Sequence, residues 1–106
     1  MNDNEYFNEE QIKELSKKRI LNILKDQSEN ILSDIKFRKN EILHVIYNSD
    51  KDRKMMYNIL NKALLYFESK ELYDECKIIY DFAKTEYEDF GTEYIEELAE
   101  ILGYKR

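Results

Sequence analysis

The sequence predicts an all-α protein, a compact antiparallel bundle of four to five helices that forms one domain over residues 1–106. Residues typical of strands are scarce, since the chain has one Val and two Thr and shows no β-branched alternation. Apolar residues recur instead at helical spacing, and no Pro interrupts them. Charged residues make up 38% of the chain, so we expect one modest core under a densely charged surface.

The first part of the predicted bundle covers residues 9–47 and contains a repeated apolar cluster. An Ile-Leu pair with a further Leu or Ile recurs every 11 residues, at 20–24, 31–35 and 42–46. Eleven residues are close to three helical turns, so the clusters share one helix face. One helix of roughly 60 Å would use this pattern, and so would two helices, 9–26 and 29–47, broken within Asp26–Asn30 with Ser28 as N-cap. Typical helix length favours the break, and we predict two helices.

The centre of the bundle is predicted to be a helical hairpin formed by residues 50–68 and 71–89. The first helix carries an apolar stripe at Met56, Ile59, Leu60, Ala63, Leu64 and Phe67. The second carries a stripe at Leu72, Tyr73, Cys76, Ile79, Tyr80, Ala83 and Tyr87. On one continuous helix the two stripes would be out of phase. A turn at residues 68–70 removes the conflict, because each helix then presents its stripe to the other.

The last predicted helix covers residues 93–102. Gly91 is suited to the left-handed position that ends the preceding helix, and Thr92 can cap the next one. The apolar residues of this helix share one side, at Tyr94, Ile95, Leu98, Ile101 and Leu102. Gly103 is expected to end it.

Residues 57–90 show a characteristic order of large, small and aromatic side chains. The first helix has Leu60, Ala63, Leu64 and Phe67, and the second has Tyr73, Cys76, Tyr80 and Ala83. This order resembles a single tetratricopeptide-type helical repeat, with its large–small pair reversed. Glu71 stands where that family has its turn glycine, and Glu88 where it has its closing proline.

The segment from Tyr73 to Asp81 also resembles the short helical hairpin at the ends of nucleotide-excision-repair subunits. It has Tyr80-Asp81 where that motif has an Arg-Asp pair. Both families use the hairpin to bind other proteins, so either resemblance implies a protein-binding function. The alternative is that any antiparallel helix pair needs small residues where the two backbones approach, without kinship.

The chain offers few side chains for catalysis. His44 is the only histidine and lies beside an apolar stripe, where we expect it to be partly buried. Cys76 is the only cysteine, and its small-residue position favours buried packing over a reactive thiol. The sequence has no Gly-rich phosphate loop, no Ser/His/Asp set and no HExxH motif. We therefore expect no enzyme activity and no catalytic, cofactor or metal site.

Tyrosines and acids are the candidate partner-binding residues. Tyrosine occurs nine times, and five copies recur every seven positions, at Tyr66, Tyr73, Tyr80, Tyr87 and Tyr94. These side chains either pack internally with the hydroxyl at the rim of the core or form an aromatic interface, and we favour internal packing. A tetratricopeptide-like groove would present Asn58, Asn61, Lys62 and Leu65. The predicted contact residues are Tyr66, Tyr87, Tyr94, Leu65, Glu93, Glu96 and Glu97.

Net charge limits the class of partner. The chain carries a net charge of −6 with a pI near 4.9, which repels nucleic acid at long range. The basic cluster Lys17–Arg19 is expected to be a solvated helix face. Residues 68–100 contain twelve acidic side chains and only three lysines. Such a surface can imitate nucleic acid, so one alternative function is a phage-type acidic inhibitor that blocks a host nucleic-acid-binding or defence protein.

The favoured function is a small acidic cytoplasmic adaptor or regulator that binds another protein and catalyses no reaction. One cysteine is typical of a reducing compartment, and the acidic N-terminus differs from a secretory signal. No apolar run approaches the roughly 20 residues of a membrane span. We expect neither a small-molecule substrate, nor a membrane, nor direct nucleic-acid contact. A homo-oligomer in which a long first helix pairs with itself is the remaining alternative.

Overall fold

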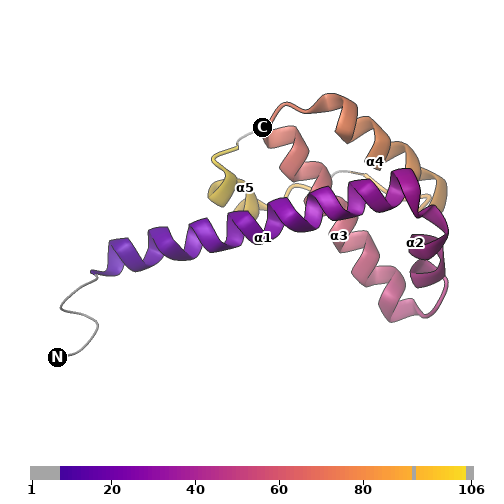
Figure 1. Ribbon diagram of the computed structural model, residues 1–106, viewed down its shortest axis with the longest axis horizontal. Helices are drawn as coiled ribbons and strands as arrows, with labels where there is room; N and C mark the ends of the chain where they lie inside the picture. Colours follow the sequence, from indigo (N-terminus) through magenta and orange to yellow (C-terminus); the bar gives the residue numbers. More distant parts are fainter. Residues whose placement is uncertain (1–7, 92, 105–106) are drawn as a thin grey trace.

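The computed structural model describes residues 8–91 and 93–104, and all regular structure within them is helical. Five helices follow one another, namely α1 (Glu9–Phe37), α2 (Lys39–Ile46), α3 (Asp50–Ser69), α4 (Tyr73–Glu86) and α5 (Glu96–Leu102) (Figure 1). The predicted all-α bundle is therefore confirmed. None of the described helices has an apolar stretch that could cross a membrane.

Helix α3 lies at the centre of the bundle and contacts each of the other four helices. It contributes Leu60 and Leu64 to the core, both almost fully buried. α4 folds back against α3 and contributes Ile79, which has no exposed surface. The chain thus doubles back after α3 as predicted, through a turn at residues 70–72 that slightly follows the predicted residues 68–70.

The predicted break of the first helix within Asp26–Asn30 is wrong, because α1 continues to Phe37 without interruption. Ser28, the predicted N-cap, lies in the middle of α1 and has no exposed surface. It shares a helix face with the buried residues Leu24 and Ile31, so the core stripe runs straight through this segment. A small polar residue marks close packing at this point, not the start of a helix.

The chain turns instead at Arg38, whose φ of −139° and ψ of 40° leave the helical region. Its N–H donates to the Asp34 carbonyl oxygen at 2.7 Å and closes the last turn of α1. α2 then folds against α3 and buries Ile42 and Ile46. The break therefore follows the second of the three apolar clusters, whereas it was predicted to follow the first.

The C-terminal segment begins with Phe90, which anchors the chain in the core with 1% of its surface exposed. α4 is shorter than the predicted range 71–89. α5 begins at Glu96, so it covers only part of the predicted range 93–102. The predicted cap of this helix, Thr92, lies outside the described residues.

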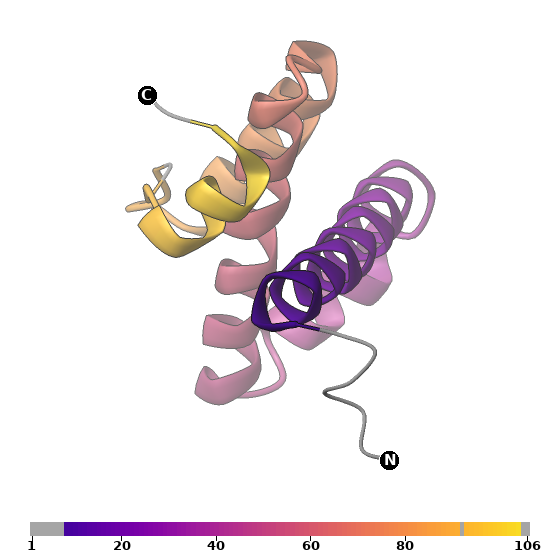
Figure 2. The same ribbon diagram turned by 90° about the vertical axis from the view of Figure 1, so that its left-hand side faces the viewer.

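The N-terminal half of α1 extends beyond the bundle (Figure 1). Viewed along α1, the helices α3, α4 and α5 lie on the same side of it (Figure 2). Every residue from Asn8 to Ile20 is exposed, and Leu24 is the first buried residue of the helix. The helix start is nevertheless well capped, because Asn8 Oδ1 accepts the Gln11 N–H at 2.8 Å and Gln11 Oε1 accepts the Asn8 N–H at 3.0 Å.

Candidate functional site

An open groove lies between the first turns of α3 and the segment that follows α4. Its volume is about 510 Å³, and its lining includes Arg53, Lys54 and Tyr57 from α3. Tyr87 and Glu93 line it from the later segment. Two of the predicted partner-binding residues are therefore brought together here.

Arg53 connects the two sides of this groove. Its guanidinium lies over the Tyr87 ring, with Cζ 4.4 Å from the ring centroid, and Nη2 donates to the Glu86 carbonyl oxygen at 2.5 Å. The Tyr87 hydroxyl donates to the Arg53 carbonyl oxygen at 2.7 Å. The Tyr47 hydroxyl donates to Glu86 Oε2 at 2.5 Å. Together these contacts hold the end of α4 against the start of α3 and against Tyr47, which precedes α3.

Two tyrosines whose rings lie under the Arg53 guanidinium, Tyr87 and Tyr47, have raised pKa values. Burial raises the pKa of Tyr87, and the Arg53 charge offsets this only in part. The hydrogen bond to Glu86 raises the pKa of Tyr47. A phenol with a raised pKa is a weak base or nucleophile near neutral pH. Tyr87 is also 4% exposed and packs edge-on against Tyr57, so it serves internal packing.

Two further predicted contact residues, Leu65 and Tyr66, lie in the core. Leu65 has no exposed surface and Tyr66 has 7%. Leu65 is therefore not presented in an open groove, because other helices surround α3. The burial of Tyr66 and Tyr87 agrees with the internal packing favoured for the tyrosines. Of the groove positions expected beside Leu65, Asn61 is also buried, whereas Asn58 and Lys62 are exposed.

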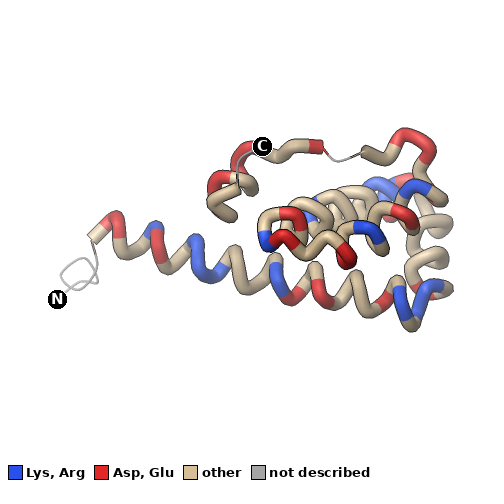
Figure 3. Tube along the Cα trace, turned by 90° about the horizontal axis from the view of Figure 1, so that it is seen from above, with Lys and Arg blue, Asp and Glu red and all other residues tan. Residues whose placement is uncertain are grey.

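The remaining predicted contact residues are exposed around the start of α5, and they are Glu93, Tyr94, Glu96 and Glu97. Tyr94 is 38% exposed, and its hydroxyl donates to the Tyr104 carbonyl oxygen at 3.2 Å. Figure 3 shows acidic positions in α5 and in the segment that leads to it. Glu96 and Glu97 lie in the first helical turn, where the helix dipole favours carboxylates. Their part in partner binding stays a prediction.

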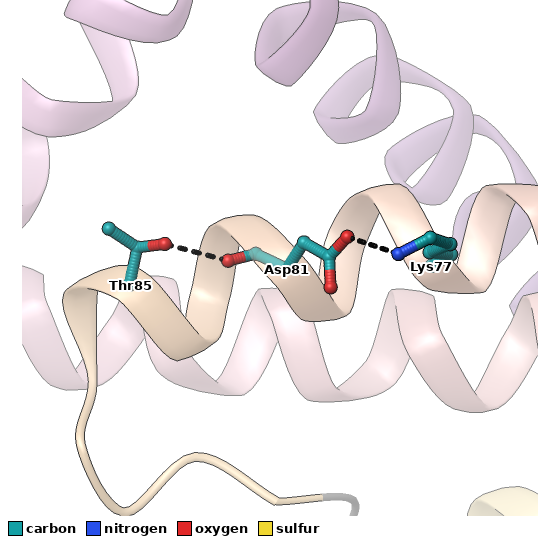
Figure 4. A network of polar contacts seen from close by, with 3 residues as sticks. All are labelled: Lys77, Asp81 and Thr85. Carbon is teal, nitrogen blue, oxygen red and sulfur yellow. Dashed lines mark hydrogen bonds and ion pairs between the residues drawn. The ribbon is translucent and has the colours of Figure 1, made fainter.

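The exposed face of α4 carries a short ladder of polar contacts (Figure 4). Lys77 Nζ lies 2.8 Å from Asp81 Oδ2, and the Thr85 hydroxyl donates to the Asp81 carbonyl oxygen at 2.8 Å. Each contact spans one turn of the same helix, so the ladder stabilises α4 locally.

Cys76 and His44 differ in their surroundings. Cys76 is buried with Sγ 3.9 Å from the Leu64 carbonyl oxygen, and burial raises the pKa of its thiol to about 11. A thiol that stays protonated at neutral pH is unlike a catalytic cysteine. His44 is exposed on α2, so its expected partial burial is wrong. Over residues 8–91 and 93–104, no three His, Cys, Asp or Glu side chains converge as metal ligands.

The main set of exposed apolar side chains lies on α1. Its exposed fractions are 47% for Ile12, 54% for Leu15, 60% for Ile23 and 79% for Phe37. Together with three polar residues these side chains form one face, which we call the outward face of α1: Ile12, Leu15, Arg19, Ile23, Asp26, Asn30 and Phe37. Helical geometry places this face away from the buried stripe of α1. A shallow groove of about 580 Å³ follows it from Ile12 to Asp26.

The outward face of α1 is absent from the residues predicted to bind a partner. In the sequence this face is marked by an 11-residue spacing. Ile23 follows Ile12 at this spacing, and Asp26 and then Phe37 follow Leu15. The core stripe of the same helix has the same period. The Ile-Leu clusters of the core stripe are the more strongly apolar pattern, so the apolar pattern of the outward face is hard to recognise from the sequence.

Comparison of the chain with protein-family models, with curated proteins and with solved structures finds no significant match. The resemblance of residues 57–90 to a tetratricopeptide-type or excision-repair-type hairpin stays a prediction.

Proposed function

We propose that the protein is a small protein-binding adaptor that docks a helix of its partner on the outward face of α1, and that it catalyses no reaction. The observation that carries this proposal is the exposure of Ile12, Leu15 and Ile23 on a helix that extends beyond its own bundle. Apolar side chains at helical spacing on an uncovered face are typical of helix docking.

The bundle holds this helix in a fixed position. Leu24, Ile31 and Ile35 anchor the C-terminal half of α1 in the core. The N-terminal half of α1 is therefore already helical before a partner binds, so binding does not have to fold this segment from the unfolded chain. Preorganisation of this kind reduces the entropy lost on association.

A photo-reactive residue in place of Leu15 tests the proposal in the native host. We expect a protein to be cross-linked from this position. The matched control carries the same residue at Met55, an exposed apolar side chain of α3. Equal cross-linking of a protein from both positions would show non-specific contact, and the absence of any product at position 15 would remove the outward face of α1 as the binding surface.

A second candidate is the acidic inhibitor that imitates nucleic acid. Most of the twelve acidic side chains between residues 68 and 100 are exposed, including Asp74, Glu88 and Asp89. Salt distinguishes the two candidates, because screening weakens contacts between exposed charges and leaves apolar contacts intact. Binding that falls steeply with ionic strength supports the inhibitor, and binding that persists supports docking on α1.

A further inference from the structure

The outward face of α1 repeats with a period of 11 residues. Ile12 is followed by Ile23, and Leu15 by Asp26 and then Phe37. Eleven residues correspond to nearly three turns, so these side chains stay on one side of a straight helix. The buried stripe lies on another side of α1, so a partner on the outward face does not compete with the bundle.

The outward face is also arranged symmetrically about the middle of the helix. α1 runs from Glu9 to Phe37, so Ile23 is its middle residue. A second copy of α1 laid antiparallel about this point brings Ile23 next to Ile23 of the partner subunit. Phe37 then lies beside the first turns of the partner's helix, close to Ile12 of the partner subunit.

Two charged residues of the face decide between antiparallel and parallel pairing. In the antiparallel pair about Ile23, Arg19 lies within one residue of Asp26 of the partner subunit along the helix axis, and the twofold axis repeats this contact. A parallel pair in register would place Arg19 against Arg19 and Asp26 against Asp26, which is unfavourable. Among the described residues, Arg19 and Asp26 form no ion pair that would have to be broken first.

The same arrangement supports the overhanging part of each helix. Residues 9–20 are all exposed in the single chain, so this part of α1 has no tertiary packing to add to its helix propensity. In the antiparallel pair about Ile23 this stretch lies along residues 26–37 of the partner subunit. Those residues are anchored in a bundle, because Ile31 and Ile35 are buried. The contact extends over the length of α1, which is roughly 44 Å.

We propose that the partner on the outward face of α1 is a second copy of this chain, paired antiparallel about Ile23. This proposal rests on the proposed function, since it uses the same face, and it adds the identity of the partner. The apolar side chains Ile12, Leu15 and Ile23 supply affinity, and the reciprocal contacts between Arg19 and Asp26 set orientation and register.

Sedimentation equilibrium of the full chain between about 1 μM and about 1 mM tests this pairing. The wild-type chain is expected to form a dimer that dissociates on dilution. Arg19→Asp or Asp26→Arg is expected to weaken the dimer about tenfold or more, because both symmetric contacts become repulsive. The double variant restores complementary charges and should restore the dimer. Lys13→Asp, on the same helix but outside the outward face, is the matched control and should leave the dimer unchanged.

The failure of this pairing differs from the failure of the proposed function. A wild-type chain that stays monomeric at the highest concentration overturns self-pairing, even when cross-linking at position 15 identifies a different protein. The dimers of Arg19→Asp and Asp26→Arg are each compared with the dimer of the control Lys13→Asp. Equal dimer strength in all three variants overturns the antiparallel register. A dimer that Ile23→Lys does not weaken is formed by another surface, which overturns self-pairing on α1.

Discussion

Glu71 occupies the same backbone position after α3 that Gly103 occupies after α5. Their φ angles are 58° and 70°, both in the left-handed region. Glu71 and Leu72 donate to the carbonyl oxygens of Glu68 and Phe67 at 3.0 and 2.9 Å, and Gly103 and Tyr104 donate to those of Glu100 and Ala99 at 3.1 and 2.9 Å. Both ends are therefore Schellman motifs, in which glycine is preferred because a Cβ is disfavoured at positive φ.

Glu71→Gly is therefore expected to stabilise the protein by about 0.5–1 kcal/mol, since relief of the left-handed strain exceeds the extra entropy of glycine in the unfolded chain. Gly103→Ala is the mirror control and should destabilise by about 1 kcal/mol. Urea denaturation of both variants at neutral pH measures the two changes. A Glu71→Gly variant less stable than the wild type would contradict the left-handed turn.

Ser28→Ala is expected to stabilise the protein by about 1 kcal/mol. Ser28 Oγ is buried and makes no hydrogen bond with the described residues, so its removal abolishes a desolvation cost and improves helix propensity. A serine that capped a helix would show the opposite sign, a loss of about 1 kcal/mol. The sign of the change in urea denaturation therefore distinguishes the continuous α1 from a helix broken at this point.

Leu64→Ala tests the packing of the hairpin. Leu64 is 2% exposed, and its truncation should cost about 2–5 kcal/mol of unfolding free energy. Met55→Ala, at an exposed position of the same helix, is expected to change stability by less than about 0.5 kcal/mol. Thermal or urea denaturation measures both. Similar costs for the two variants would mean that α3 does not bury its Leu64 face.

The buried thiol makes stability depend on alkaline pH. The pKa of Cys76 rises from an ordinary 9.0 to about 11 in the folded chain, because burial disfavours the thiolate. The unfolded chain therefore loses this proton first, and stability is lost as pH rises from about 9 to about 11. Cys76→Ala should remove this part of the pH dependence. The wild type and the variant have the same tyrosines, so any contribution of the tyrosines is common to both. If the unfolding free energies of the two proteins fall equally with pH over that range, the raised pKa of Cys76 is contradicted.

Local periodicity predicts the hairpin well but not the length of the first helix. The out-of-phase stripes of residues 56–67 and 72–87 require a turn whatever their neighbours are, and the structure has it. Ser28 is ambiguous, because a small polar residue serves equally as N-cap or as a close-packing position. Only the tertiary contact of α1 with α3 decides between the two. The end of α1 at Arg38 likewise has no Gly or Pro signal, and it follows from the packing of α2 against α3.

The exposure of individual side chains is harder to predict from the sequence than the helical structure of the segments that carry them. Leu65 and Tyr66 lie beside the predicted stripe of α3, and a hairpin alone would leave that side open. They are buried because other helices also pack around α3. The outward face of α1 is missed for the opposite reason, since Ile12, Leu15 and Ile23 resemble core residues until the structure shows that no other part of the described chain covers them.

Disulfide trapping at Ile23 tests the pairing of α1 most directly. The native Cys76 is buried and its thiol pKa is raised, so it contributes little background reaction. Under mild oxidation, Ile23→Cys should give a disulfide-linked dimer, because the two copies of this position meet at the twofold axis. Leu15→Cys alone should give none, whereas a mixture of Leu15→Cys and Asn30→Cys chains should cross-link. Equal trapping at positions 15 and 23 would indicate a parallel pair, and no trapping at position 23 would contradict self-pairing through α1.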